Sequence, residues 1–200
     1  MITDLFIVEL NVRLKLLDIR KLKPRAEEIL NTLPEERRQK ALCYRKEEDQ
    51  IRSIGSTFLI MQTVSWQKVY FGKYGKPLAY GKNFNVSHSG NYVVLAESEK
   101  SIGVDIEELK DDITADLIEV GFTKREKGWI GNSHIRFYIL WTRKESLLKC
   151  VGTGFGMNPN QIDALPGKHL VQYMGNFYQL FSTVFDKHII SIALNSTKSL

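Results

Sequence analysis

Hydrophobic and polar residues alternate most regularly between residues 101 and 107, near the middle of the chain. Apolar side chains fill every second position of this stretch, at Ile102, Val104 and Ile106. This two-residue period predicts a half-buried β-strand. Gly103, Asp105 and Glu107 share the other face, so two carboxylates stand about 6.6 Å apart along the strand. The glycine ahead of them leaves room for another group to approach closely.

The residues before this strand predict a second strand and a polar site. Residues 92–97 are rich in β-formers, and the polar segment Ser98–Lys100 between the two runs predicts a hairpin turn. The segment Asn85–Gly90 leads into this hairpin and contains hydroxyl groups and an imidazole, which suit an anion.

Helical periodicity dominates the rest of the first half. Residues 5–14 predict a first strand, and Thr32–Glu35 predicts a capping box at the start of a basic helix. A second helix is expected over about residues 47–70, with Gly72 ending it. Its buried stripe consists of Ile51, Ile54, Phe58, Met61 and Val64.

The second half predicts helices followed by strands. Residues 110–127 are expected to be helical in part, and residues 134–150 form the strongest helical pattern. From residue 168 onward, three β-rich runs separated by short turns predict an antiparallel meander. We therefore expect an α+β fold with a boundary near residue 100.

The composition is that of an ordinary globular protein, with 43% hydrophobic and 26% charged residues. The N-terminal stretch lacks the features of a secretion signal, and the apolar run Phe58–Met61 is far too short to span a membrane. Cys43 and Cys150 have no metal-ligand spacing and fit reduced thiols. These observations predict a cytoplasmic protein.

The net charge of +5 lies entirely in the first half of the chain. Residues 1–100 contain 17 Lys and Arg against 12 Asp and Glu, whereas residues 101–200 contain 11 of each. A basic half suits a polyanionic ligand, an acidic partner protein or nucleic acid. A mild excess of this size is also typical of a solvated surface.

The helix at residues 134–150 adds a third carboxylate. Trp141, Glu145 and Lys149 are spaced by four residues and so share one face, with Lys144 beside them. Taken alone, such a Glu–Lys pair is typical of a helix surface and contributes only about 0.3–0.5 kcal/mol. Together with the two strand carboxylates, however, these residues would suit Mg²⁺ and a diphosphate, because Mg²⁺ prefers oxygen ligands and often shares substrate phosphates.

Three segments in this order, FNVSHSG, IGVDIE and WTRKESLLK, resemble the 4′-phosphopantetheinyl transferases of the surfactin-synthetase-activating type. YGKP before the first segment and FTKRE between the second and third also match the family pattern. The resemblance spans roughly Pro34 to Gly154. It departs from the family by one change within the last segment, where Ser146 stands in place of alanine.

The resemblance implies two similar α/β subdomains related by a pseudo-twofold axis, with coenzyme A in the cleft between them. Residues 1–100 would bind coenzyme A, and residues 101–200 would bind Mg²⁺ and supply the catalytic groups. The implied reaction moves the phosphopantetheine arm of coenzyme A onto a serine of an acyl or peptidyl carrier protein. The protein is expected to act as a monomer and to bind neither nucleic acid nor a membrane.

The resemblance also implies a role for individual residues. The Mg²⁺ ligands would be Asp105, Glu107 and Glu145. The diphosphate would meet Lys144 and Lys149. The 3′-phosphate would meet Arg52, Ser87 and His88, and the adenine would lie against the turn formed by Gly75, Lys76 and Pro77. Where relatives have two lysines, Glu36 and Gln39 stand here, with Arg37, Arg38 and Lys40 nearby.

In this interpretation the carrier serine attacks the β-phosphorus of coenzyme A and expels 3′,5′-ADP. Glu145 is the candidate general base and Lys149 a second catalytic residue. Two other classes fit part of the pattern. A Mg²⁺-dependent phosphohydrolase acting on nucleotides could use the same carboxylates, and a nucleic-acid-binding module could use the basic half, although aromatic residues are not interleaved with the basic cluster.

Overall fold

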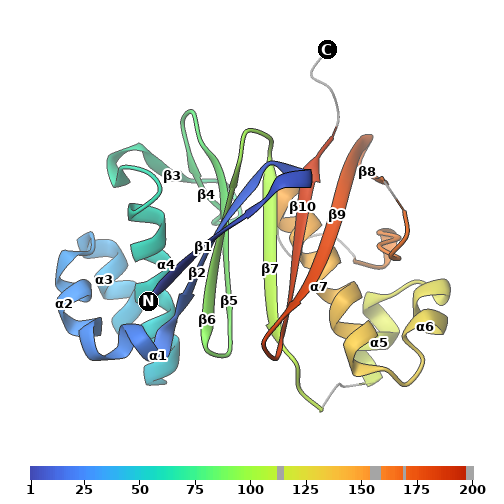
Figure 1. Ribbon diagram of the computed structural model, residues 1–200, viewed down its shortest axis with the longest axis horizontal. Coiled ribbons are helices and arrows are strands. Elements are labelled where there is room, and N and C mark those ends of the chain that lie inside the picture. Colours follow the sequence, from blue (N-terminus) through green and yellow to red (C-terminus); the bar gives the residue numbers. More distant parts are fainter. Residues whose placement is uncertain (112–114, 154–158, 169, 197–200) are drawn as a thin grey trace. The chain divides into compact units, whose positions relative to one another are not determined.

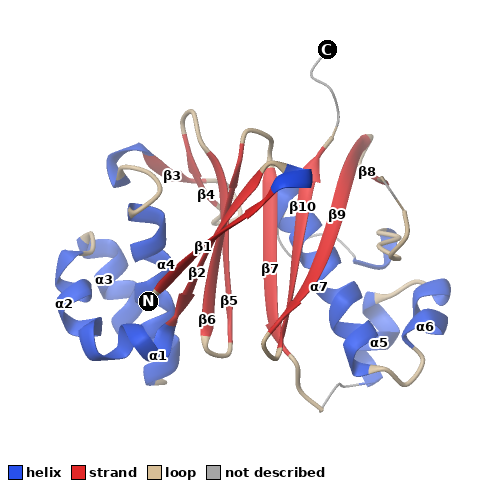
Figure 2. Ribbon diagram, in the orientation of Figure 1, coloured by secondary structure: helices blue, strands red, loops and turns tan. Residues whose placement is uncertain are grey.

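The computed structural model describes residues 1–111, 115–153, 159–168 and 170–196, and it divides into two compact units. Unit 1 is Met1–Glu99 and unit 2 is Lys100–Leu200. Each unit combines helices with an antiparallel sheet (Figure 1, Figure 2). The α+β fold class is therefore confirmed, while the pseudo-twofold relation between the units stays a prediction.

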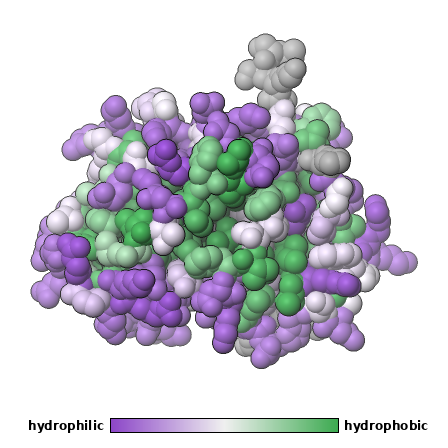
Figure 3. All heavy atoms as spheres, viewed as in Figure 1, coloured by the Kyte–Doolittle hydropathy of each residue, from purple (hydrophilic) through white to green (hydrophobic). Residues whose placement is uncertain are grey.

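Unit 1 is built around a four-stranded antiparallel sheet of order β1-β2-β6-β5. Its strands are β1 (Ile2–Ile7), β2 (Val12–Asp18), β5 (Asn83–Ser89) and β6 (Tyr92–Ser98), and a separate ribbon consists of β3 (Val69–Phe71) and β4 (Pro77–Ala79). The helices are α1 (Ile19–Leu22), α2 (Ala26–Thr32), α3 (Glu35–Leu42) and α4 (Glu47–Met61), with short 3₁₀ turns at Val8–Leu10, Lys23–Arg25 and Trp66–Lys68. Hydrophilic side chains gather over α2 and α3 in the surface view (Figure 3).

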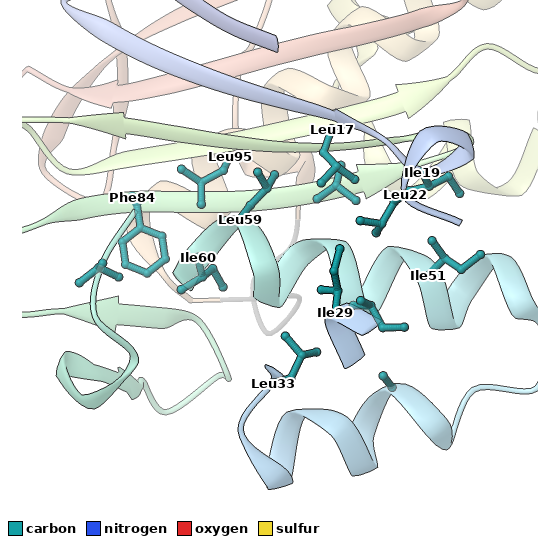
Figure 4. Close-up of a cluster of buried hydrophobic side chains, with 14 of the residues drawn as sticks. Leu17, Ile19, Leu22, Ile29, Leu33, Ile51, Leu59, Ile60, Phe84 and Leu95 are labelled. Carbon is teal, nitrogen blue, oxygen red and sulfur yellow. The ribbon is translucent and has the colours of Figure 1, made fainter. Parts of the chain in front are cut away.

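Helix α4 forms the centre of the core of unit 1. It packs against the sheet on one side and against α2 and α3 on the other. Ile51, Leu59 and Ile60 of α4 lie between Leu17 and Leu95 of the sheet and the residues of α2 and the segment after it (Figure 4). The predicted apolar stripe is therefore confirmed in part. Ile51 and Ile54 are buried and Phe58 and Met61 are partly buried against the same core, but the buried face also contains Leu59 and Ile60, and Val64 lies beyond the end of the helix.

Two predictions for unit 1 are wrong because the chain turns earlier than the pattern indicates. Residues 5–14 do not form one strand, since the chain reverses at Val8–Asn11, where Asn11 adopts a left-handed backbone with φ 51°. Helix α4 ends at Met61 and not near Gly72. Lys15 of β2 donates to the Gln62 carbonyl and the Thr63 hydroxyl, which satisfies the end of the helix there.

Two predicted local motifs are also absent from the described residues. Thr32 does not cap α3, because it lies in α2 and donates to the Ile29 carbonyl, and the N-cap of α3 is Pro34. Ser98–Lys100 does not form a hairpin turn. Strand β6 pairs with β2 and β5, whereas the strand after it pairs in the sheet of unit 2, so each finds a partner distant in sequence.

Unit 2 consists of an antiparallel sheet with one long helix packed across it. The strands are β7 (Ile102–Glu108), β8 (Val171–Tyr173), β9 (Asn176–Phe185) and β10 (His188–Asn195), in the order β7-β10-β9-β8. The helices are α5 (Ala115–Gly121), α6 (Lys124–Ile130) and α7 (His134–Val151), with a 3₁₀ turn at Pro159–Gln161. The predicted meander and the predicted long helix are both confirmed. No helix in the described parts of the chain is both long and apolar enough to cross a lipid bilayer.

Helix α7 contacts β7 directly at Gly103. A β-carbon added at Gly103 would lie 2.0 Å from the Ser146 carbonyl oxygen and 2.3 Å from the Cys150 nitrogen, both backbone atoms of α7. Such distances are impossible for a real side chain, so the helix can approach the strand this closely only because residue 103 is glycine. The sequence prediction of a close approach at Gly103 is therefore confirmed, and the approaching group is the backbone of α7.

We predict that Gly103→Ala destabilises unit 2, because the added methyl group meets backbone atoms that cannot rotate away. The loss should equal or exceed the value typical of overpacking, which is about 1–3 kcal/mol. Urea denaturation followed by tryptophan fluorescence measures the loss. Gly128→Ala in α6 is the matched control, since no atom lies within 4 Å of the added carbon. This control is expected to be neutral or slightly stabilising. Equal stability of the two variants would contradict the prediction.

Candidate functional site

The face of β7 that contains Gly103 and Asp105 lies beneath helix α7. Because alternate residues of a strand share a face, the contact at Gly103 places Asp105 under the same helix. Asp105 is only 2% exposed, so it does not lie on a solvated outer face. The two-residue alternation correctly placed Asp105 on one face with Gly103. The prediction of a half-buried strand is wrong, because Ile102, Val104 and Ile106 of the other face are buried as well as Asp105.

Helix α7 presents Lys149 and Glu145 to this face. The Lys149 ammonium donates to the Asp105 carboxylate at 2.6 Å, and the lysine side chain is 31% exposed. Glu145 lies one helical turn before Lys149 and is 6% exposed. The structure therefore brings Asp105, Glu145 and Lys149 together, as the sequence predicted.

The charged form of Glu145 is disfavoured by its surroundings. Its Oε1 atom is buried, and no hydrogen bond reaches that atom from the described residues. The pKa of Glu145 is raised from 4.5 to about 7, chiefly because burial disfavours the charged form. Charge on Asp105 adds to the rise, the Lys149 ammonium opposes it, and Glu107 contributes a smaller increase. Three carboxylates thus repel one another across a strand and a helix.

This set of charges fits a divalent cation in its chemistry. Asp105 pairs with the Lys149 ammonium, the charge of Glu107 acts on Glu145, and an oxygen of Glu145 is buried and receives no hydrogen bond from the described residues. Mg²⁺ prefers such ligands and usually completes its coordination with water or substrate phosphate. Within the described ranges, however, no three Asp, Glu, His or Cys side chains are already grouped closely enough to hold a metal ion. Asp105 instead binds the Lys149 ammonium.

Lys144 occupies a different environment from its neighbour Glu145. It is 0% exposed, and its ammonium donates to Glu126 Oε2 at 2.7 Å and to the carbonyl oxygens of Gly121 and Pro159 at 3.0 and 2.9 Å. Burial lowers the pKa of Lys144, and the carboxylate of Glu126 opposes that change. The structure does not bring Lys144 to the surface beside Lys149.

Glu126 belongs to the FTKRE segment, and the sequence alone assigned it no role. It is 0% exposed, and it forms a capping box with Thr123 at the start of α6. The Thr-x-x-Glu spacing in the sequence was the signal that could have identified this box. The contact with Lys144 could not have been found that way, because the two residues are 18 positions apart.

In unit 1, Arg52 and His88 both lie close to Asp49, near the turn between β5 and β6. The Arg52 guanidinium donates to the Gly90 carbonyl at 2.6 Å and to the Asp49 carboxylate. The hydrogen bond from Arg52 is the main cause that lowers the pKa of Asp49, and the charge of His88 adds a smaller effect. Ser87, the residue before His88, is buried and points to the opposite face of β5.

The remaining candidates of unit 1 lie on the β3–β4 ribbon and on α3. Lys76 and Pro77 follow Gly75, which has φ 78°, and the Gly72 amide closes this turn by donating to the Lys76 carbonyl at 2.9 Å. Arg37 of α3 is held within unit 1. Its guanidinium donates to Thr57 at 3.1 Å and lies over the rings of Trp66 and Phe71, 5.9 and 5.6 Å from their centroids.

Comparison with known proteins places this site in a family context. Residues 101–193 match the family model described as the 4′-phosphopantetheinyl transferase superfamily. The chain is similar to "4′-phosphopantetheinyl transferase ffp" of Bacillus subtilis, at 31% identity over 147 residues, which cover 66% of this chain and 65% of that protein. It is also similar to "4′-phosphopantetheinyl transferase gsp" of Aneurinibacillus migulanus, at 32% identity over 138 residues, covering 62% and 58%.

A third relative, a "4′-phosphopantetheinyl transferase" of Bacillus subtilis, is 33% identical over 140 residues, which cover 61% of each chain. The chain thus matches less than two thirds of the length of these relatives. The resemblance inferred from the sequence motifs is confirmed.

We predict that the metal-free protein loses stability as the pH rises from about 4.5 to about 7. The pKa of Glu145 is higher in the folded state than in the unfolded state. Its contribution to folding stability is therefore fully present below the unfolded-state pKa and is lost as the pH rises through the folded-state pKa. A shift of this size corresponds to roughly 3 kcal/mol. Urea denaturation in EDTA between pH 4.5 and 8 measures it. Glu145→Gln, which cannot ionise, should flatten this decline, and an unchanged slope would exclude Glu145 as its source.

Proposed function

We propose that this chain, whose residues 101–193 belong to the 4′-phosphopantetheinyl transferase superfamily, transfers the phosphopantetheine arm of coenzyme A to a serine of a carrier protein. The acceptor would be an acyl or peptidyl carrier protein, and the reaction would release 3′,5′-ADP. The observation that supports this proposal most directly is the convergence of Asp105, Glu107 and Glu145 beside Lys149, within the part of the chain that matches the family.

The reaction exchanges the phosphoanhydride bond of coenzyme A for a phosphate ester bond to the carrier serine. The serine oxygen of the carrier forms a bond to the β-phosphorus of coenzyme A, and the bond from that phosphorus to the oxygen retained by 3′,5′-ADP breaks. The serine proton must be accepted as the new bond forms. Glu145 is the candidate to accept it, because its carboxylate lies beside Asp105 and Lys149 in this site. Its pKa of about 7 applies to the site without a cation, and a bound cation would lower that pKa.

Lys149 supplies positive charge beside Glu145. Its ammonium is partly exposed, so it can reach a bound diphosphate while it remains near Asp105. Negative charge moves onto the leaving phosphate as the bond to 3′,5′-ADP breaks, and a fixed ammonium stabilises that charge. Lys149 would therefore orient the diphosphate and stabilise the leaving group.

Asp105, Glu107 and Glu145 would hold Mg²⁺. When bound, this ion would neutralise charge on the diphosphate and polarise the phosphorus that is attacked. The carboxylates themselves explain why a cation is needed, since their mutual repulsion and burial raise the pKa of Glu145 in its absence.

Unit 1 would bind the nucleotide portion of coenzyme A. Arg52 and His88 would meet the 3′-phosphate, and this assignment is supported by their common position near Asp49 and Gly90. Ser87 lies on the opposite face of β5, so any contribution it makes to binding the 3′-phosphate would come from that face. Lys76 and Pro77 would lie against the adenine. We further propose that the protein acts as a cytoplasmic monomer without nucleic acid or a membrane.

The test is to incubate the protein with coenzyme A, Mg²⁺ and an apo carrier protein, and then to determine the mass of the carrier. A gain equal to one phosphopantetheine group, with equimolar 3′,5′-ADP, is the expected result. Hydrolysis of a nucleotide with no gain in carrier mass would instead favour the phosphohydrolase. Binding of nucleic acid without either reaction would favour a non-catalytic module.

We predict that Asp105→Ala, Glu107→Ala and Glu145→Ala each lower kcat/KM for transfer by about 100-fold or more, because each removes a proposed ligand of the cation that would stabilise charge on the phosphates. Glu108→Ala is the matched control, since this carboxylate belongs to the same strand but to the opposite face. It should retain nearly normal activity. Near-normal turnover by one of the first three variants at saturating Mg²⁺ would remove that residue from the site.

We also predict that, without substrate, the Lys149→Met variant binds Mg²⁺ at least about tenfold more tightly than the wild-type protein. The variant should nevertheless transfer the phosphopantetheine arm more slowly. The ammonium repels a divalent ion and occupies the Asp105 carboxylate, and two unit charges 4 Å apart repel by about 1 kcal/mol in water and about 4 kcal/mol at an effective dielectric constant of 20. Isothermal titration calorimetry measures the affinity. Weaker Mg²⁺ binding by the variant would show that Lys149 supports the metal site instead of competing with it.

A further inference from the structure

The ammonium of Lys144 has its complete set of hydrogen bonds inside unit 2. A lysine ammonium has three N–H donors, and those of Lys144 meet Glu126, the Gly121 carbonyl and the Pro159 carbonyl at 2.7, 3.0 and 2.9 Å. The ring of Phe122 lies 4.9 Å from the same nitrogen. Lys144 is 0% exposed. No N–H group of this side chain is left to bind a phosphate in this arrangement.

Glu126 is equally well satisfied. Its Oε2 atom accepts from the Thr123 amide at 2.8 Å as well as from Lys144, and its Oε1 atom accepts from the Ala164 amide at 2.9 Å. Both carboxylate oxygens are therefore occupied, and the residue is 0% exposed. This differs from Glu145, which has a buried oxygen that no hydrogen bond reaches among the described residues.

The pair connects two segments to helix α7. Through Glu126 and Lys144 it holds the turn between α5 and α6, and through Pro159 and Ala164 it holds the residues 159–164. Arg143, the residue before Lys144, donates to the Ala164 carbonyl at 2.6 Å. The amide and the carbonyl of Ala164 are thus both held by this one part of the fold.

Moving Lys144 to a ligand would be costly. It would leave the Glu126 carboxylate buried without its counter-ion and would remove the donor from two carbonyl groups, and uncompensated buried charge is strongly destabilising. Lys149 has no such constraint, since it is partly exposed and paired with a residue of the candidate site. The diphosphate is therefore the task of Lys149 and not of Lys144.

We propose that Lys144 and Glu126 are positioning residues, whose buried ion pair fixes the rotation of α7 about its axis so that Glu145 and Lys149 face β7. Successive residues of a helix point about 100° apart, so holding Lys144 toward α6 directs its neighbour Glu145 toward the strand. The proposal gives Lys144 no contact with substrate. Its kinetic consequences rest on the proposed transferase function, and its structural consequences do not.

The structural test is a double-mutant cycle on the full chain without substrate. Lys144→Met and Glu126→Gln should each raise the unfolding equilibrium constant by about 100-fold or more, because each leaves its partner charge buried and unpaired. The double variant should lose much less than the product of the two single losses. Lys127→Met is the matched control, since it breaks the exposed pair of Lys127 with Glu119 and should change the constant by less than about threefold.

Losses that multiply in the double variant would overturn the proposal, because residues that act independently show no coupling. This measurement needs no activity, so it remains decisive even if the protein transfers nothing. If either single variant fails to fold, recovery of a folded protein by the double variant supports the pair, and failure of the double variant as well contradicts it.

The kinetic test separates positioning from phosphate binding. A positioning role predicts that both folded variants lower kcat by a similar factor, while KM for coenzyme A stays within about threefold of the wild-type value. A phosphate ligand at Lys144 predicts that Lys144→Met raises that KM by about tenfold or more and that Glu126→Gln does not. The double variant is expected to show the unchanged KM as well, and a raised KM confined to variants that lack Lys144 would overturn the proposal.

Discussion

The backbone contact between helix α7 and Gly103 of β7 is the constraint on which the rest of unit 2 depends. It brings a helix and a strand closer than side chains normally allow, so the residues on either side of the contact can meet directly. The backbone of Cys150 contacts Gly103. Asp105 lies two residues after Gly103, and Lys149 lies one residue before Cys150. The ion pair between Asp105 and Lys149, and the burial of Glu145, both follow from this approach.

Close packing obliges α7 to bury consecutive charged residues, and each is satisfied in a different way. Arg143 donates to neutral groups of unit 2, among them the carbonyls of Ala164 and Leu180. Lys144 pairs with Glu126. Glu145 has no comparable arrangement, and its pKa rises instead. Buried polar groups in stable folds are normally satisfied, so the cation proposed for this site would give Glu145 the partner that its Oε1 atom does not find among the described residues.

Sequence reasoning succeeded where the signal is local. The alternation around Asp105 and the spacing of Glu145 and Lys149 correctly predicted faces of a strand and a helix, since those periods are properties of the backbone. It failed at Ser98–Lys100, because which strands pair is decided by residues far away in the chain. It also placed Lys144 beside Lys149, because the sequence shows helical neighbours but not the distant carboxylate that draws one of them into the core.

Two of the side chains proposed to meet a phosphate are already bound to carboxylates of this chain. Lys149 is paired with Asp105, and Arg52 is paired with Asp49. An anionic ligand must therefore exchange with an internal partner, and its affinity reflects the difference between two ion pairs and not the full strength of one. The internal carboxylate keeps each cation oriented before the ligand arrives, which lowers the entropy lost on binding. The excess charge of residues 1–100 is thus a poor measure of affinity, since much of it, including Arg37, is engaged within unit 1.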